Sequence, residues 1–346
     1  MQKLGITESD AGQRLDKFLA KYLDTAPKSF IYKMLRKKNI ELNGKKAEPG
    51  ALLQSGDEIS LWLSDETIAG FRGTDREKAL EKTEKKASGK RTDQEGRWNR
   101  APRIPIIFED AQLMIADKPA GMLSQKGSAS DHSLNEYLFE RLQDRPGAPA
   151  AETYGFRPSI CNRLDRNTSG LITFAKTYQA ARFLTELFAA RRLHKYYLAV
   201  AAGTIRERFR AEGWIKKDAH HNQAEVRDYA FAGAERIETE YEPLRHFTGP
   251  AGDVTLLKIL LITGKTHQIR ADLKTLGHPI LGDPKYGDME LNRRIFQKTG
   301  IRRQLLHAWE LQFPEIDSRT FSYLSGRIFR APVPVDFERA GVHGAE

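Results

Sequence analysis

The stretch 162-NRLDRNTSGLITFAK-176 joins a turn to an apolar run and places one acid, Asp165, between two arginines. The apolar residues within 171–174 predict a short strand, and the turn-forming residues within 167–170 stand just before it. Asp165 is therefore expected on an irregular segment at the edge of a sheet. Rigid scaffolds commonly display catalytic groups on such segments.

Two interpretations of this aspartate are open. In the first, Asp165 belongs to an ion-paired surface turn. In the second, it is a catalytic carboxylate that Arg163 and Arg166 keep ionised, since a nearby cation favours the charged form. An ionised carboxylate suits a nucleophile or a general base, whereas a general acid needs a proton at neutral pH.

The composition restricts the function classes. The net charge of +10 over 346 residues favours a polyanionic partner, most simply a nucleic acid. The single cysteine, Cys161, excludes an internal disulfide and argues against a cysteine-based metal site, and we predict no bound metal. No apolar run is long enough to span a membrane and no signal peptide is visible, so we expect a cytoplasmic protein.

Three zones follow one another along the chain. Residues 1–64 mix helical and strand-like patterns, and residues 104–338 alternate strand-like and helical stretches. Between them, 65–103 is dominated by charged residues and reads as a flexible linker, because it has too little apolar surface to offset the entropy of ordering. A solvated helix held by Glu–Lys pairs is the alternative for this middle zone.

The first zone contains an amphipathic basic helix. Within 29-SFIYKMLRKKNIELNGKK-46, Ile31, Met34 and Leu35 share one face. On the other side the helix carries Lys33, Arg36 and Lys37, and Lys45 follows an Asn-Gly turn. These cations suit the phosphates of a nucleic-acid backbone, and a solvated helix face is the alternative.

With the preceding run RLDKFLAKYL, this zone resembles an S4 RNA-binding domain over nearly its whole length. The resemblance implies a compact α/β module that binds structured RNA through the helix bearing Lys33, Arg36 and Lys37.

Two further segments carry candidate functional residues. The pattern within 178–188 predicts a core-packed helix, and a strand over 195–200 follows it, with Tyr197 on the face opposite to Tyr196. Later, a helix is predicted over 266–276 with Ile269, Leu273 and Leu276 as its buried face. Arg270 lies in the first turn of that helix, where the dipole disfavours a cation, so a nearby carboxylate such as Asp165 would stabilise it.

Together NRLDRNTSGL, LHKYYLAV and GKTHQIRADLKTLGHPILGDPKYG resemble the RluA-type pseudouridine synthases, the RluC/RluD-like branch, over about residues 104–335. The resemblance implies that Asp165 is the nucleophile, that Tyr197 stacks on the base and takes a proton, and that Arg270 is the partner of Asp165. It also implies isomerisation of uridine in RNA, without cofactor or metal, by a chain expected to be monomeric. Ribosomal large-subunit RNA is the expected substrate and transfer RNA an alternative. Further RNA contacts are assigned to Arg163, Arg166, Lys265 and His267.

The expected fold is α+β, with a small S4-like module beside a large catalytic domain of mixed, mainly antiparallel sheet flanked by helices. Two other functions remain as alternatives. A non-catalytic RNA-binding or assembly factor would tolerate changes at Asp165. A glycosidic-bond hydrolase would usually pair its carboxylate with a second, protonated acid, and none stands near the RLD segment.

Overall fold

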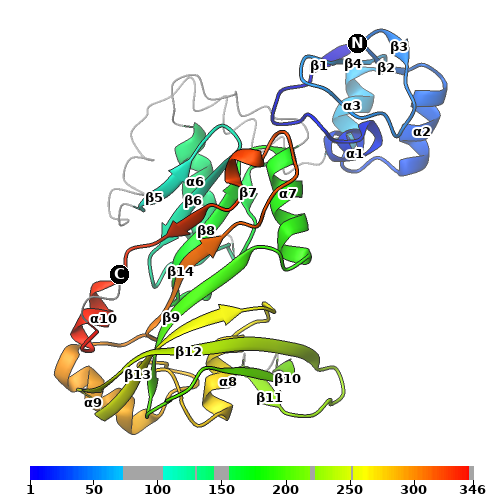
Figure 1. Ribbon diagram of the computed structural model, residues 1–346. Coiled ribbons are helices and arrows are strands. Elements are labelled where there is room, and N and C mark those ends of the chain that lie inside the picture. Colours follow the sequence, from blue (N-terminus) through cyan, green and yellow to red (C-terminus); the bar gives the residue numbers. More distant parts are fainter. Residues whose placement is uncertain (73–103, 129–130, 144–155, 219–222, 251, 343–346) are drawn as a thin grey trace, which may run out of the picture.

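A computed structural model of the chain describes residues 1–72, 104–128, 131–143, 156–218, 223–250 and 252–342 (Figure 1). Most of the expected linker, 73–103, lies outside the described residues. The prediction of an α+β fold with a large, mixed and mainly antiparallel sheet flanked by helices is confirmed.

The N-terminal module is a four-stranded antiparallel sheet packed against helices. Its sheet has the order β1-β4-β2-β3, with strands β1 (Gln2–Gly5), β2 (Ile40–Leu42), β3 (Lys45–Lys46) and β4 (Glu58–Leu61). Its helices are α1 (Leu15–Tyr22), α2 (Lys28–Arg36) and α3 (Asp65–Phe71). As the apolar spacing predicts, α2 buries Ile31, Met34 and Leu35.

The boundary expected at residue 64 needs a correction. Residues 65–71 form α3, which begins at a Ser64 cap whose side chain accepts a hydrogen bond from the Thr67 amide. Ile68 is buried in the core of the N-terminal module, and Phe71 packs against Phe30 with ring centroids 4.6 Å apart. The N-terminal module therefore includes α3, whose buried apolar face is hard to detect in a sequence rich in charged residues.

The second sheet spans the rest of the described chain. Its main path has the order β11-β10-β12-β13-β9-β14-β8-β6-β5, with β15 paired to β14 and β7 paired to β8. The first of its strands are β5 (Ile106–Glu109), β6 (Leu113–Lys118), β7 (Ser159–Ile160), β8 (Ser169–Ala175), β9 (His194–Ala202) and β10 (Phe209–Asp218). The others are β11 (Gln223–Arg227), β12 (Glu235–Gly249), β13 (Gly252–Leu261), β14 (Leu306–Gln312) and β15 (Ile328–Arg330).

Helices cover both faces of this sheet. They are α6 (Leu134–Gln143), α7 (Tyr178–Ala189), α8 (Gln268–Thr275), α9 (Met289–Thr299) and α10 (Val335–Arg339), with a short 3-10 turn, η1 (Ser322–Leu324). Residues that alternate along β6 and β8 enter two different cores, one that includes residues of α6 and α8 and one that includes residues of α7. Among the helices of the described ranges, none combines the length and apolar character needed to cross a membrane.

The contact between β8 and β14 is parallel. The other strand pairs of this sheet are antiparallel in the described part of the chain, but His307 and Ala308 pair in parallel with Ser169 and Gly170. Gly170 has φ +115°, and a Cβ atom there would lie only 2.6 Å from the backbone nitrogen of Ala308. Glycine is therefore required where the segment that follows Asp165 enters the sheet.

The N-terminal module contacts the sheet domain through the loop before α1. The Ser9 carbonyl accepts a hydrogen bond of 3.0 Å from the Tyr178 amide in the first turn of α7. The fully buried Asp10 carboxylate accepts one of 2.9 Å from the Phe156 amide, and the Lys21 ammonium lies 5.3 Å from the Tyr178 ring centroid. This loop thus satisfies an amide at the start of a helix in the other domain.

Candidate active site

Asp165 lies on the irregular segment that enters β8, as the sequence predicts. Its carbonyl accepts a hydrogen bond from the Thr168 amide, closing a turn. On one side, the Ser124 hydroxyl donates to the Leu164 carbonyl at 2.7 Å. On the other, the Asn162 side chain accepts from the Thr173 amide at 2.8 Å. The segment is therefore held from both flanks, and a quarter of the Asp165 side chain stays exposed.

Arg270 connects this aspartate to a second, fully buried carboxylate. One guanidinium nitrogen donates to Asp165 Oδ2 at 2.6 Å, and two others donate to the Asp283 oxygens at 2.7 and 2.9 Å. Asp283 also accepts from two backbone amides, those of Lys285 and Tyr286. The misfit of a cation in the first turn of α8 is thus relieved by two carboxylates instead of the single one expected.

Buried charge is stabilised in this pair. The Arg270 side chain is 5% exposed and that of Asp283 is not exposed at all. Although burial disfavours the charged form, hydrogen bonds from Arg270 and its positive charge lower the pKa of Asp283 below its usual range. Asp283 therefore remains an anion that fixes the orientation of Arg270.

His267 approaches Asp165 beside Arg270. Its Nε2 lies 3.8 Å from Asp165 Oδ2, and its Nδ1 lies 2.9 Å from the Tyr286 hydroxyl. The Tyr286 ring packs under Arg270, whose guanidinium carbon is 5.0 Å from the ring centroid. Burial lowers the pKa of His267, with Arg270 and Lys285 acting in the same direction and Asp165 opposing them, so the imidazole is neutral at neutral pH.

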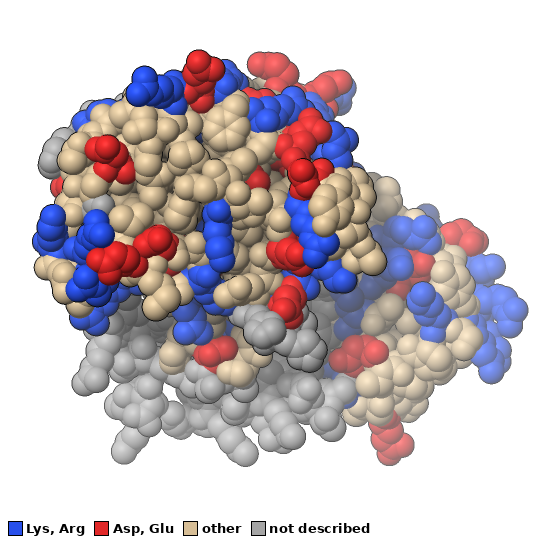
Figure 2. Space-filling model, turned by 90° about the horizontal axis from the view of Figure 1, so that it is seen from below, with Lys and Arg blue, Asp and Glu red and all other residues tan. Residues whose placement is uncertain are grey.

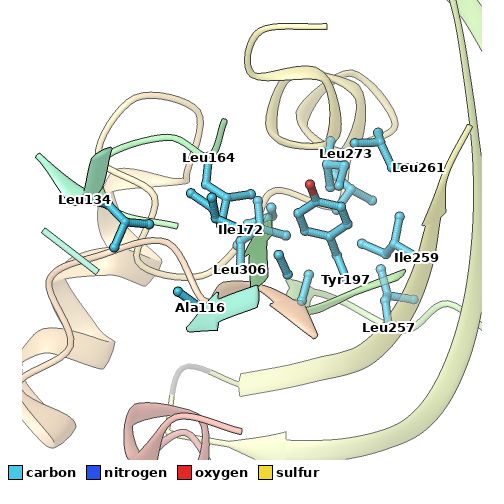
Figure 3. Packing of buried hydrophobic residues seen from close by; sticks show 14 of the residues in the cluster. Ala116, Leu134, Leu164, Ile172, Tyr197, Leu257, Ile259, Leu261, Leu273 and Leu306 are labelled. Atoms are coloured by element: carbon cyan, nitrogen blue, oxygen red, sulfur yellow. The ribbon is translucent and has the colours of Figure 1, made fainter. Parts of the chain in front are cut away.

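Tyr197 forms the apolar wall next to these polar groups. Its side chain is 7% exposed, and Figure 3 shows its ring between Ile172 and Ile259 with the hydroxyl directed away from Leu257. Burial, and secondarily the negative charge of Asp165, raise the pKa of Tyr197 well above its usual value. The phenol thus carries its proton at neutral pH. Tyr196 was predicted to face away from Tyr197. In agreement, the Lys258 ammonium lies over the Tyr196 ring, 4.6 Å from its centroid.

A buried lysine, Lys118, holds the segment that carries Asp165. The Lys118 ammonium, at the end of β6, donates to the carbonyls of Pro119, Met122 and Arg166 at 3.0, 2.9 and 3.0 Å. Burial lowers its pKa to about 7. Three carbonyl acceptors match the three protons of an ammonium group, so Lys118 joins the loop after β6 to the residue that follows Asp165.

The cations assigned to RNA lie in two separate groups. Near Asp165, Arg163 and Arg166 are exposed, whereas the Lys265 ammonium forms an ion pair with Glu235. On the N-terminal module the exposed cations are Lys33, Arg36, Lys37 and Lys45. Figure 2, in which this module is the fainter part, shows basic side chains gathered along its outer side. Lys33 and Arg36 line a groove of about 360 Å³ that Tyr32 and Lys46 complete.

Sequence reasoning did not reveal Asp283, Tyr286 or Lys118 as functional residues. Asp283 and Tyr286 belong to GDPKYG, at the end of a longer signature, and Lys118 belongs to DKPAGM. One signal points to Asp283, since a cation in the first turn of a helix demands negative charge nearby. The predicted burial of Leu276 was wrong. The helix ends at Thr275, so Leu276 is its C-terminal cap and is 40% exposed.

Within the described parts of the chain, no three His, Cys, Asp or Glu side chains are grouped so that they could hold a metal ion.

Both the sequence and the fold of the chain are similar to those of known proteins. Residues 112–275 match the family model for RNA pseudouridylate synthases. Two human solved structures share the fold. RNA Pseudouridylate Synthase Domain Containing 1 is 25% identical with a TM-score of 0.50, covering 61% of this chain and 79% of that one. RNA Pseudouridylate Synthase Domain Containing 4 is 22% identical with a TM-score of 0.51, covering 70% and 94%. The family model and the shared fold together indicate the class of RNA pseudouridine synthases.

Full-length relatives extend this similarity beyond the sheet domain. An uncharacterized RNA pseudouridine synthase of Mycoplasma pneumoniae is 31% identical, over 90% of this chain and 88% of its own length. The ribosomal large subunit pseudouridine synthase C of Escherichia coli K12 is 29% identical, over 96% and 92%. The chain belongs to the RluA-type family of RNA pseudouridine synthases, with homology to RluC, and is an isomerase.

Proposed function

We propose that this isomerase converts uridine to pseudouridine in large-subunit ribosomal RNA, with Asp165 as nucleophile and without a cofactor. The observation that carries the catalytic part is the 2.6 Å bond from Arg270 to Asp165, beside the apolar wall that Tyr197 forms. The named substrate of the Escherichia coli relative supports the choice of RNA.

The chemistry needs one nucleophile and one proton transfer. The C1′–N1 bond of the nucleotide breaks, a C1′–C5 bond forms, and the proton lost from C5 is balanced by one gained at N1. Asp165 supplies the carboxylate that attacks either C1′ of the sugar or C6 of the ring. Arg270 orients this carboxylate, and because Asp283 holds Arg270 in place, little reorganisation is needed when the nucleotide arrives.

Tyr197 supplies a ring that stacks on the extruded base and a hydroxyl that exchanges a proton. Burial, and secondarily the negative charge of Asp165, raise the pKa of Tyr197, so the hydroxyl enters the reaction with its proton. The neutral phenol takes the C5 proton while it passes its own proton on toward N1, so the proton lost from C5 and the proton gained at N1 balance. In this mechanism the tyrosine relays the C5 proton after the aspartate has reacted.

The N-terminal module, residues 1–72, serves as an S4-like RNA-binding domain. Lys33 and Arg36 of α2 and Lys46 of β3 line one groove, together with the exposed Tyr32. Cations that line a groove can contact phosphates, which fix the register of an RNA without reading its sequence. Such contacts also supply binding energy for extruding the target base, a step that costs a few kcal/mol. We infer that the enzyme works as a cytoplasmic monomer.

Release of tritium tests the proposal directly. Large-subunit ribosomal RNA is transcribed with uridine labelled at C5, and the wild type is compared with Asp165→Asn and with Asp317→Asn, an exposed carboxylate that serves as control. We expect release by the wild type and by Asp317→Asn, and none by Asp165→Asn at unchanged RNA affinity.

The same assay separates the alternatives. Turnover by Asp165→Asn would overturn the nucleophile assignment. Free uracil without tritium release would indicate a hydrolase, and binding without either product would indicate an assembly factor. Release only from transfer RNA transcripts would replace the proposed substrate.

A further inference from the structure

The backbone of His267 is held in a conformation that costs energy. Its φ of 59° and ψ of 15° lie in the left-handed region, which non-glycine residues rarely adopt. The strain is maintained by neighbours, because Gln268 accepts hydrogen bonds from the Lys265 amide and the Thr263 hydroxyl. Strained residues that their surroundings over-determine cluster at functional sites, where the strain aims a side chain.

The hydrogen bonds around His267 favour one tautomer of its imidazole. The Tyr286 hydroxyl accepts a hydrogen bond of 2.6 Å from the Ala224 amide, so its own proton is free to be donated to His267 Nδ1 at 2.9 Å. A neutral imidazole that accepts at Nδ1 carries its proton at Nε2. This Nε2–H is the group that faces Asp165.

Nε2–H and the Asp165 carboxylate form a donor and an acceptor side by side. Their separation of 3.8 Å is too long for a direct hydrogen bond, yet one hydroxyl oxygen can lie about 2.8 Å from both atoms. Such a hydroxyl would accept a hydrogen bond from His267 Nε2–H and donate its own proton to Asp165 Oδ2. It would thus act as acceptor and donor at once. Arg270 already donates to the same oxygen, so the three groups surround one small polar position.

We propose that this position receives the 2′-hydroxyl of the target uridine, making His267 a specificity-determining residue that selects ribose over deoxyribose. The inference rests on the proposed function, since it places the reacting sugar at Asp165. The 2′-hydroxyl is the donor-and-acceptor group next to C1′, and it is the group by which a protein distinguishes RNA from DNA. His267 thus acts on the reacting nucleotide itself, and not only on the flanking phosphates.

The proposed contact between His267 and the 2′-hydroxyl is tested by a double-mutant cycle, in which one change is made in the protein and the other in the substrate. A short RNA containing the modified uridine, located first by mapping the ribosomal RNA, is made with either ribose or 2′-deoxyribose at that nucleotide alone. The protein change is His267→Gly, which removes the imidazole and suits the left-handed backbone. The electronic effect of the hydroxyl on the reaction is common to both proteins and cancels in the comparison.

We expect the wild type to prefer ribose in kcat/KM by about 10- to 100-fold, because deoxyribose leaves the buried Nε2–H of His267 unpaired and removes one hydrogen bond to the Asp165 carboxylate. In His267→Gly this preference should fall by about 5- to 10-fold, with ribose activity reduced and deoxyribose activity unchanged. Tyr286→Phe keeps the ring beneath Arg270 and removes the proton donated to His267 Nδ1. The ribose preference of this variant should lie between those of the wild type and His267→Gly.

Equal ribose preference in wild type and His267→Gly would overturn the assignment while leaving the proposed function intact. The assignment also fails if His267→Gly loses activity equally on both sugars. A wild type that releases no tritium from the all-ribose RNA would instead remove the proposed function, and this inference with it.

Discussion

Arg270 in the sheet domain and the cations on α2 of the N-terminal module are arranged in opposite ways. Arg270 is 5% exposed and lies between Asp165 and Asp283, which together accept all three of its hydrogen bonds. Lys33, Arg36 and Lys37 are exposed, and none of them has an ion-pair partner among the described residues. The first arrangement fixes a geometry before the substrate arrives, whereas the second leaves charge available for a partner.

The contrast has an energetic meaning. A buried ion pair costs desolvation and is stabilising only when its hydrogen bonds are complete, so it is sensitive to the loss of either member. Exposed cations gain little from one another, but they release counterions when they meet phosphates. We therefore expect changes in the sheet domain to alter turnover and stability, and changes on the module to alter affinity and its salt dependence.

The largest effect should come from Asp283→Asn. Removing this charge leaves Arg270 buried with one carboxylate and frees it to turn toward Asp165 at altered geometry. We expect kcat to fall at least about 100-fold, with KM nearly constant, and stability to fall by about 3 kcal/mol. Single-turnover kinetics and urea unfolding measure the two effects. A variant with normal kcat would show that the buried carboxylate does not position Arg270.

A smaller effect concerns His307, buried beside Ser169 at the contact between β8 and β14. Burial, with the charge of Arg303, lowers its pKa to about 3, against about 6.5 in an unfolded chain. Between these values the unfolded state binds a proton that the folded state does not, so stability falls as pH drops below about 6.5. From pH 7 to pH 5 this amounts to about 2 kcal/mol.

Urea unfolding at both pH values checks this prediction. In His307→Gln, the unfolding free energy should fall by about 2 kcal/mol less between pH 7 and pH 5 than in the wild type. In His194→Gln, at an exposed histidine, the unfolding free energy should fall as much as in the wild type. An equal slope in wild type and His307→Gln would mean that His307 does not titrate with unfolding.

The replacement of Lys33, Arg36 and Lys37 by alanine should act on binding alone. We expect RNA affinity to fall roughly tenfold at 0.1 M salt and the slope of log K against log salt to become less steep by about 2 to 3. Saturating RNA should restore kcat. An unchanged salt slope in fluorescence anisotropy would show that α2 does not face the RNA.

The smallest effect is expected at an exposed ion pair of the sheet domain. Glu290 on α9 contacts Arg293 at 2.8 Å and Arg294 at 3.1 Å, and all three side chains are about half exposed. Because solvent screens such pairs, Glu290→Gln should not change the urea midpoint measurably. A large shift of the urea midpoint in Glu290→Gln would mean that exposed and buried ion pairs do not differ in their contribution to stability.

Sequence and structure agree best where periodicity or a dense motif carries the information. The helix face with Ile31, Met34 and Leu35 and the strand that follows Asp165 were predictable, because burial imposes their spacing. The pairing of Arg270 with Asp165 was predicted from helix electrostatics and a family resemblance together, and the structure has it at 2.6 Å.

The remaining features depend on tertiary contacts that no local pattern encodes. Asp283 lies in a turn, where acids are common for local reasons, and its bond to Arg270 exists only because the chain folds back after α8. The helix α3 was not predicted from the sequence, because only Ile68 and Phe71 of its seven residues pack into the core of the N-terminal module. The exposed Leu276 shows that capping sets the end of a helix. The apolar pattern predicted a helix that extends to residue 276, one residue beyond its observed end.

Gly170, at the meeting of β8 and β14, should tolerate substitution as poorly as Asp165 does, for a different reason. Any side chain at Gly170 would overlap the backbone of Ala308. In a saturation library of residues 162–170, every allele at codon 170 should score as null, together with those at codon 165. The two kinds of null separate by abundance, since the Asp165 alleles accumulate as folded protein and the Gly170 alleles are degraded.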